Sequence, residues 1–421
     1  MTEDYLHYIW KHRLFETNHL KTVEGESVSI IHSGNHNKNA GPDFLEGKIK
    51  IGDQLWAGSI ELHVYSSDWQ KHNHQSDKAY NNVVLHVVYA DDVKALREDR
   101  STIPTLELKG LFDEMGYWHY EQFVSAKRFL ACGEQVKWVD NIHISTMLDR
   151  VLVERLDEKS AFVKQVFKAT KNDWNETFYR MLVYSFGLKI NANAMLRLAE
   201  RLPLSVLRKH AGNHFQVEAL LFGCAGFLDG EDEFQRTLKK EFAFLQAKYN
   251  LQPLEKEEFK FSRLRPMGFP TVRLAQLAGI LSSTPDMFRV AIGVEKPVQI
   301  LKLLTTLTSE YWQNHFTFGN ESKEQEKAVS ATLANQVMIN AVVPTLFLYA
   351  TLKNESETRF RVIDWLRELK AEQNQLVTNY TAAGFNANSA SDSQALLQLY
   401  KNYCQQRKCL SCAIGVKLLK Q

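Results

Sequence analysis

The stretch NAGPDFLEGKIKIGDQLWAGSIELHVYSSDWQKHNHQSDKAYNNVVLHVVY, residues 39–89, decides the fold of the first part of the chain. Two segments within it, FLEGKIKIGD and QLWAGSIELHVY, predict a β-hairpin, because the Gly-Asp pair between them suits a tight turn. Alternate side chains of a strand share a face, so Glu61 and His63 are expected on the same side of the sheet. The stretch therefore combines a strand framework with a concentration of acidic and histidine side chains.

Segments on either side of this hairpin extend the pattern. Apolar residues from Tyr5 to Leu14 recur at three and four residues, which is helical spacing. Between the first strand and the hairpin, SGNHNKNAGPD predicts a loop, since Pro42 keeps the residue before it out of helical geometry. Asp68 is expected to cap a short helix. The predicted order is a helix through Tyr5–Leu14, a strand over 27–32, the hairpin, a short helix over 68–80, and strands over 81–92 and 102–110.

From about Asp140 the sequence changes to helical spacing almost without interruption. A chain of 421 residues is too long for one ordinary core, and roughly 150 residues per domain suggests two or three domains. We therefore predict an α/β domain with a mixed sheet over residues 1–135. A mainly α-helical domain, which includes the C-terminal cysteines, is predicted over residues 136–421.

Composition narrows the function classes. Lysine and arginine total 51 against 49 acidic residues, so a nucleic-acid site would have to be a local patch. No apolar run approaches the ~20 residues that span a bilayer, and the first residues lack a signal-peptide core, which predicts a cytoplasmic protein without a membrane partner. The absence of a Walker A or Gly-rich dinucleotide motif argues against nucleotide-driven chemistry. The oligomeric state stays open.

Three residues of the opening stretch have the pattern of a hydrolytic metal site. Asp43 follows Pro42 at the start of the first hairpin strand, and Glu61-x-His63 lies on its partner. Two such carboxylates can hold Mg²⁺ or Mn²⁺ between them, and a third side chain on the same face reaches the water or the phosphate. The alternative interpretation is a turn-forming Pro-Asp and a polar strand face.

This arrangement resembles the PD-(D/E)xK nuclease superfamily, whose restriction-endonuclease-like core begins with helix, strand, hairpin, helix and strand. The resemblance implies metal-dependent hydrolysis of nucleic-acid phosphodiester bonds. Asp43 and Glu61 would bind the metal, and His63, which occupies the usual lysine position, would assist the water. The alternative is a non-catalytic scaffold for nucleic acid or protein, built on a degenerate nuclease core.

The histidines offer a second metal hypothesis, which would place a metalloenzyme of another hydrolytic class here. Imidazole is a preferred ligand of Zn²⁺ and Mn²⁺. In the alternative interpretation, His72 and His74 are exposed residues of the helix. His86 then belongs to the core, because its side chain is expected on the same strand face as Val84 and Val88. The candidate ligands on and after the second hairpin strand are His63, His72, His74 and Asp77, with His86 the least favoured.

The C-terminal cysteines form the third candidate site. Cys404, Cys409 and Cys412 have the x4, x2 intervals of a plant-type ferredoxin run, which needs one more distant cysteine, either Cys132 or Cys224. An iron–sulfur cluster or a zinc ion would fit such a set. Some PD-(D/E)xK nucleases use one remote and three C-terminal cysteines around an iron–sulfur cluster, which this spacing resembles. Buried or unligated thiols are the alternative.

One basic segment is a candidate nucleic-acid surface. Arg263, Arg265 and Arg273 lie among phenylalanines, and arginine can bind phosphate while aromatic rings stack on bases. Ordinary ion pairing and core packing explain the same residues equally well.

Over nearly its full length the chain resembles an uncharacterised bacterial family of the domain-of-unknown-function kind, which implies no established activity. The segments that carry the resemblance are WKHRLF, NAGPDF, GSIELH, DWQKHNH, NNVVLHVV, EALLFGCAGFL, RLRPMGFPTVRLAQLA and CLSCAIG.

Overall fold

The computed structural model describes residues 1–37 and 39–419. Its contacts divide the chain into two compact units. Unit 1 comprises Met1–Met147 together with the C-terminal residues from Lys401, and unit 2 comprises Leu148–Tyr400. The domains predicted from the sequence, residues 1–135 and 136–421, assign the C-terminal cysteines to the helical part. The C-terminal segment groups with unit 1 because Leu410, Val416 and Leu419 pack against its hydrophobic core.

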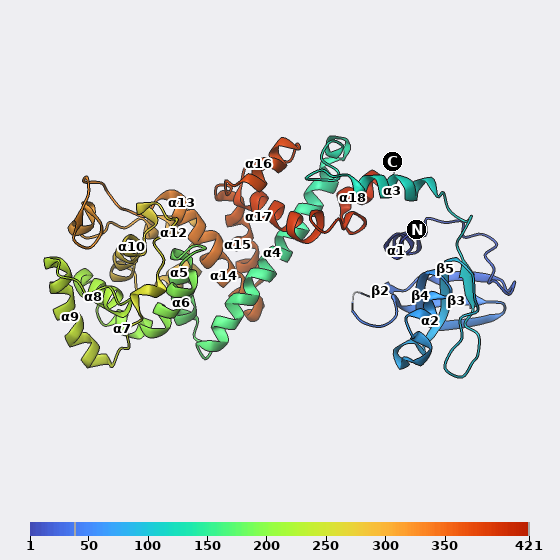
Figure 1. Ribbon diagram of the computed structural model, residues 1–421, viewed down its shortest axis with the longest axis horizontal. Helices are drawn as coiled ribbons and strands as arrows, with labels where there is room; N and C mark the ends of the chain where they lie inside the picture. The colour runs from blue at the N-terminus through green and yellow to red at the C-terminus, as the bar shows by residue number, and fades with distance from the viewer. Residues whose placement is uncertain (38, 420–421) are drawn as a thin grey trace. The chain divides into compact units, whose positions relative to one another are not determined.

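Unit 1 is built on a mixed six-stranded sheet (Figure 1). Strands β1, β3 and β4 are antiparallel, whereas β4, β5 and β6 run parallel, and β2 pairs with β3 at the edge. The sheet confirms the predicted mixed α/β class and the predicted hairpin. Its strands are β1 (Val28–His32), β2 (Asn35–His36), β3 (Phe44–Ile51), β4 (Gln54–Tyr65), β5 (Val83–Ala90) and β6 (Thr105–Glu107). The predicted loop over 33–43 therefore contains β2, and at Lys38 it includes a position outside the described residues.

Helix α1 (Glu3–His12) covers one face of this sheet (Figure 1). Its apolar stripe, with Leu6, Ile9 and Trp10 fully buried, packs in one core with Ile60 and Leu62 of β4. Burial of each large apolar side chain contributes roughly 1.5–3 kcal/mol, so this face supplies most of the apolar packing of the sheet. The opposite face of β4 carries Glu61, His63 and the segment that follows β4.

That following segment is not the single helix predicted over 68–80. It forms three short pieces, α2 (Asp68–Lys71) and the 3₁₀ turns His74–Ser76 and Lys78–Tyr80. The break falls at Asn73, whose φ of 61° is left-handed and incompatible with a continuing helix. Asp68 is the first residue of α2 rather than its cap, and its carboxylate accepts the backbone N–H of Tyr65 at 3.0 Å. A second, smaller apolar cluster of Trp69, Val83, Ala95 and Ile103 lies under this segment.

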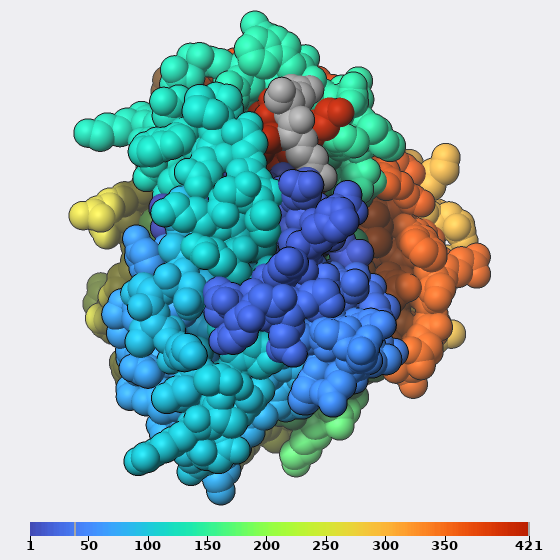
Figure 2. Space-filling model, turned by 90° about the vertical axis from the view of Figure 1, so that its right-hand side faces the viewer, coloured from blue at the N-terminus to red at the C-terminus, as the bar shows by residue number. Residues whose placement is uncertain are grey.

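Three further helices belong wholly or partly to unit 1. Helix α3 (Met115–Ser125) follows the sheet and packs against α18 (Ala413–Leu419). The long helix α4 (Asn141–Ala169) begins in unit 1 and continues into unit 2. In Figure 2 the C-terminal residues, coloured red, come to the surface beside the teal segment that follows the sheet.

Unit 2 is mainly helical, as the sequence predicts. Its small β7–β8 hairpin spans His315–Thr317 and Asn320–Glu321. Among the described residues one helical span, Ala331–Lys353, is apolar and long enough to cross a membrane, but 72% of its most apolar window is buried inside the protein, as in a core helix. The helices after α4 are α5 (Trp174–Phe186), α6 (Ala192–Arg201), α7 (Leu204–Arg208), α8 (His214–Cys224), α9 (Glu233–Tyr249), α10 (Pro270–Ser283), α11 (Met287–Gly293), α12 (Pro297–Leu304), α13 (Ala331–Val337), α14 (Val343–Lys353), α15 (Ser356–Glu368), α16 (Gln375–Ala382) and α17 (Ala390–Leu399).

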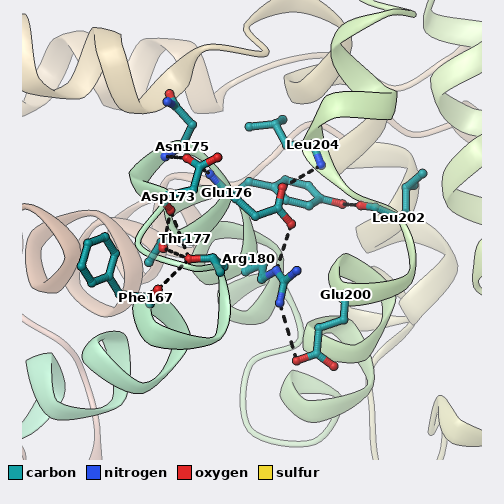
Figure 3. A network of polar contacts seen from close by, with 11 residues as sticks. Phe167, Asp173, Asn175, Glu176, Thr177, Arg180, Glu200, Leu202 and Leu204 are labelled. Atoms are coloured by element: carbon teal, nitrogen blue, oxygen red, sulfur yellow. Dashed lines mark hydrogen bonds and ion pairs between the residues drawn. The ribbon is translucent and has the colours of Figure 1, made fainter.

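A polar network fixes the start of α5 in unit 2 (Figure 3). The Asp173 carboxylate accepts the backbone N–H groups of Asn175 at 2.8 Å and Glu176 at 3.2 Å. Glu176 in turn accepts from Arg180 Nε and from the backbone N–H of Leu204, both at 2.9 Å. One end of α5 is thereby joined to the start of α7.

Replacing Asp173 by alanine should lower the free energy of unfolding of unit 2 by about 1 kcal/mol, the usual cost of an N-cap. Two backbone N–H groups lose their acceptor, although water can reach them. Urea unfolding monitored by circular dichroism measures the change. Asp149→Ala is the control, because that carboxylate lies on α4 in an exposed 3.7 Å ion pair with Arg367, which contributes little. Equal effects of the two substitutions would contradict the capping role.

Candidate metal centre

The start of β3 and the middle of β4 hold Asp43 and Glu61 beside each other. The backbone N–H of Asp43 donates to Glu61 Oε2 at 3.1 Å, and the backbone N–H of Leu62 donates to Asp43 Oδ2 at 2.9 Å. The pairing of β3 with β4 shifts register between Phe44 and Gly47, a bulge of the kind often found next to active sites. The two predicted carboxylates are therefore adjacent, and each has one oxygen engaged by a backbone amide.

His63 lies at the centre of a chain of imidazoles. Its Nδ1 is 2.8 Å from His86 Nε2, and its Nε2 is 3.2 Å from His72 Nδ1. Both His63 and His86 are buried, with relative exposures of 1% and 0%. Burial, reinforced by the neighbouring histidines, lowers the pKa of His63 to about 2, and burial lowers the pKa of His86 to about 3. His63 is therefore a neutral imidazole and does not reproduce the permanent charge of a lysine.

Three of the predicted histidines converge from β4 and the segment after it. One ring nitrogen from each of His63, His72 and His74 lies within 4.8 Å of the others. The left-handed residue Asn73 makes this convergence, because it reverses the backbone between His72 and His74. His74 is held by stacking on Tyr80, with ring centroids 3.7 Å apart. The arrangement is that of three imidazole ligands around one position.

Glu61 faces this trio with its other oxygen. Oε1 lies 3.3 Å from His74 Nε2 and 3.7 Å from His63 Nε2. Burial raises the pKa of Glu61, and the negative charge of Asp43 acts in the same direction. His74 Nε2 is buried and faces Glu61 Oε1 without a well-directed hydrogen bond. A cation between the imidazoles and the carboxylate would suit this geometry.

His7, which is not among the residues predicted from the sequence, approaches the same centre from α1. Its Nε2 lies 3.1 Å from Asp43 Oδ2, and its ring packs edge-on against Phe44. Burial lowers the pKa of His7, but the interaction with Asp43 and the nearby acidic residues outweigh it, so the pKa is raised overall. Helical periodicity gives no sign of this role, because the orientation of α1 over the sheet depends on contacts distant in sequence.

Other predicted residues lie apart from this centre. Asp77 is exposed, and its carboxylate accepts the backbone N–H of Ala79 at 2.9 Å, which makes it the N-cap of the second 3₁₀ turn. In unit 2, Arg263 and Arg265 are exposed, whereas Arg273 is half-buried and donates to Gln276 Oε1 at 2.9 Å. Burial lowers the pKa of Arg273 to about 10. The three arginines therefore differ in their access to solvent.

The cysteines divide between the two units. Cys132, Cys404, Cys409 and Cys412 line one pocket within unit 1. Cys224, the other candidate for a fourth ligand, is fully buried in α8 of unit 2. Of the two remote cysteines that the sequence left open, the pocket contains Cys132.

No curated protein and no solved structure matches the chain. A family model described as Protein of unknown function (DUF2851) matches residues 3–375. This match covers most of both units, and it agrees with the full-length resemblance to an uncharacterised family. The chain therefore belongs to the DUF2851 family.

Proposed function

We propose that unit 1 is a metal-dependent hydrolase of nucleic-acid phosphodiester bonds, with the ion held by His63, His72 and His74 beside Glu61. The observation that carries the proposal is the convergence of these three imidazoles, with Glu61 Oε1 3.3 Å from His74 Nε2. Three protein ligands with a further position left for water or substrate are the usual design of a catalytic site for an imidazole-preferring metal.

The donor set fits Mn²⁺ or Zn²⁺ better than Mg²⁺. Mg²⁺ requires near-octahedral oxygen coordination, but Asp43 and Glu61 each have one oxygen engaged by a backbone N–H. Neutral imidazole is a ligand for the transition metals, and the low pKa of His63 keeps that ring neutral at physiological pH. The Asp43 carboxylate then serves to hold the start of β3 against β4, next to the ion.

Bound metal would polarise a phosphoryl oxygen and acidify a water molecule. Glu61 Oε1, within 3.7 Å of two ligand nitrogens, is placed to take a proton from that water. His86 shares a hydrogen bond with His63 Nδ1, and this bond fixes the orientation of the His63 ring. His7, paired with Asp43 at 3.1 Å, would supply an imidazole at the edge of the same centre.

Nucleic acid is proposed as the substrate because of the order of elements around the site. The succession of helix α1, strand β1, the β3–β4 hairpin, α2 and β5 resembles that of the PD-(D/E)xK core, and in this resemblance Asp43 and Glu61 would take its acidic positions. The neutral His63 at the lysine position favours a second candidate, a non-catalytic scaffold built on a degenerate nuclease core.

Cleavage assays separate these two functions. Full-length protein is stripped of metal, then supplied with Mn²⁺, Zn²⁺ or Mg²⁺ and incubated with single- and double-stranded DNA and RNA. Cleavage that depends on Mn²⁺ or Zn²⁺ supports the hydrolase. If Mn²⁺ binds but no nucleic acid is cleaved with any of the metals, the hydrolase proposal fails and the scaffold is favoured.

His72→Ala should weaken Mn²⁺ binding by at least about tenfold, because one of three imidazole ligands is lost. Isothermal titration calorimetry with Mn²⁺ measures the change, and Mn²⁺ is chosen because cysteine thiolates prefer softer metals. Since His72 is exposed, the substitution should leave the circular dichroism spectrum unchanged. His119→Ala, at an exposed position of α3, is the matched control and should bind Mn²⁺ like the unmodified protein. Equal affinity in both variants would remove His72 from the site.

A further inference from the structure

A pocket in unit 1 gathers four of the five cysteines. Cys132, Cys404, Cys409 and Cys412 line it together with Phe123, Ala131, Tyr403, Lys408 and Gly415. We propose that the four thiolates of this pocket hold an iron–sulfur cluster. The proposal is independent of the histidine centre, which uses other residues and other ligand types.

The local backbone is shaped to present the three C-terminal thiols. Cys404 ends the π-helical turn Tyr400–Cys404, Cys409 begins the 3₁₀ turn Cys409–Ser411, and Cys412 directly precedes α18. Arg407, with a left-handed φ of 53°, reverses the chain between the first two cysteines. A Cβ at Gly415 would lie 2.4 Å from Cys409 O, so α18 can pack on the cysteine turn only because this residue is glycine.

A separate set of contacts brings Cys132 to the same place. Arg407 Nη2 donates to the backbone oxygens of Ala126 at 2.9 Å and Arg128 at 2.8 Å, in the segment just before Cys132. Lys417 of α18 lies 3.5 Å from the Asp140 carboxylate on the other side of that segment. The fourth ligand therefore arrives through contacts between segments that are far apart in sequence.

The pocket places cations beside the four thiols. A metal-bound thiol is deprotonated outright, so four cysteine ligands would give the site negative charge. Lys408 and Arg407 supply positive charge near the net negative charge that a thiolate-ligated cluster would carry.

The spacing of the cysteines along the chain favours an iron–sulfur cluster over a single zinc ion. Cys404, Cys409 and Cys412 have the x4, x2 intervals of the plant-type ferredoxin run, which needs one more distant cysteine. Cys132, which lines the same pocket, supplies that distant cysteine.

Metal analysis of the full-length protein tests the proposal. The chain is purified without oxygen, or reconstituted with ferrous iron and sulfide, and its iron, acid-labile sulfide, zinc and visible spectrum are measured. We expect iron and acid-labile sulfide in equal amounts, about two or about four of each per chain, and a brown colour. One zinc per chain without iron, or no bound metal after reconstitution, would overturn the proposal.

Variants make the test residue-specific. Cys409→Ala should reduce bound iron at least about fivefold, since a cluster lacking one thiolate is labile. Cys224→Ala, which removes the buried thiol of unit 2, is the matched control and should keep the full iron content. Full iron content in Cys409→Ala would overturn the assignment. Glu61→Gln should also retain its iron, so that failure of the nuclease proposal and failure of the cluster proposal give different results.

Discussion

Glu61→Gln should reduce metal-dependent cleavage by roughly 10²–10⁴-fold, the range attributed to a positioned general base. Glutamine has the shape of glutamate and can still accept the backbone N–H of Asp43. It lacks the negative charge that faces His63 and His74, and it cannot take a proton from water. The fold should therefore persist while the chemistry is lost.

The rate of cleavage at saturating Mn²⁺, measured with the substrate that the unmodified protein cleaves best, quantifies this effect. Glu46→Gln is the matched control, because this exposed carboxylate lies on β3 and hydrogen-bonds Asn35 at 2.9 Å, away from the histidines. The control should cleave at close to the original rate. A Glu61→Gln variant that loses less than about fivefold would exclude Glu61 as the base and leave it a structural acceptor.

Local sequence was sufficient to predict the framework of the site. The hairpin strands are found where the apolar alternation and the Gly-Asp turn place them, and Glu61 and His63 share a face because side-chain parity in a strand does not depend on tertiary contacts. The full burial of His86 also agrees with the alternative interpretation, which placed this residue in the core. Side-chain parity within each strand could not predict the contact of His86 with His63, because a crossover connection joins β4 to β5.

Contacts between distant segments account for what the sequence did not reveal. His7 reaches Asp43 through the docking of α1, and the C-terminal cysteines join unit 1 through contacts that include the packing of Leu410, Val416 and Leu419. The convergence of His72 and His74 depends on one left-handed residue, Asn73. A helix continuing through these positions would have set their side chains about 200° apart around its axis, on different faces.

The two faces of the β4 strand have different physical roles. The α1 face is a conventional apolar core around Ile60 and Leu62, whereas the opposite face buries an acid and several imidazoles. Buried polar groups cost free energy unless they are paired, and a small apolar cluster around Trp69 lies beside them. Natural proteins contain such destabilising groups at functional sites, where the chemistry requires them.

Trp69→Ala tests how far that small cluster supports the histidine centre, and it should lower the stability of unit 1 by about 3–5 kcal/mol. Trp69 is 1% exposed, and its indole Nε1 donates to Leu96 O at 3.0 Å. Its ring lies 5.4 Å from that of His74 and 5.5 Å from that of His86, measured between centroids. Removal of the indole leaves a cavity directly beside a ligand and beside the residue that orients His63, so Mn²⁺ affinity should fall as well.

Hydrogen exchange measured by mass spectrometry on peptides covering β4 and β5 reports the stability of unit 1 without interference from unit 2. Trp118→Ala is the matched control, since that indole is 55% exposed on α3, and its loss should change stability by no more than about 0.5 kcal/mol. Trp69→Phe keeps most of the ring and should recover much of the Mn²⁺ affinity while losing the hydrogen bond to Leu96. Should Trp69→Ala destabilise β4 and β5 yet bind Mn²⁺ as tightly as the unmodified protein, the apolar cluster would support the sheet alone, and the orientation of His74 would have to depend on its stacking with Tyr80.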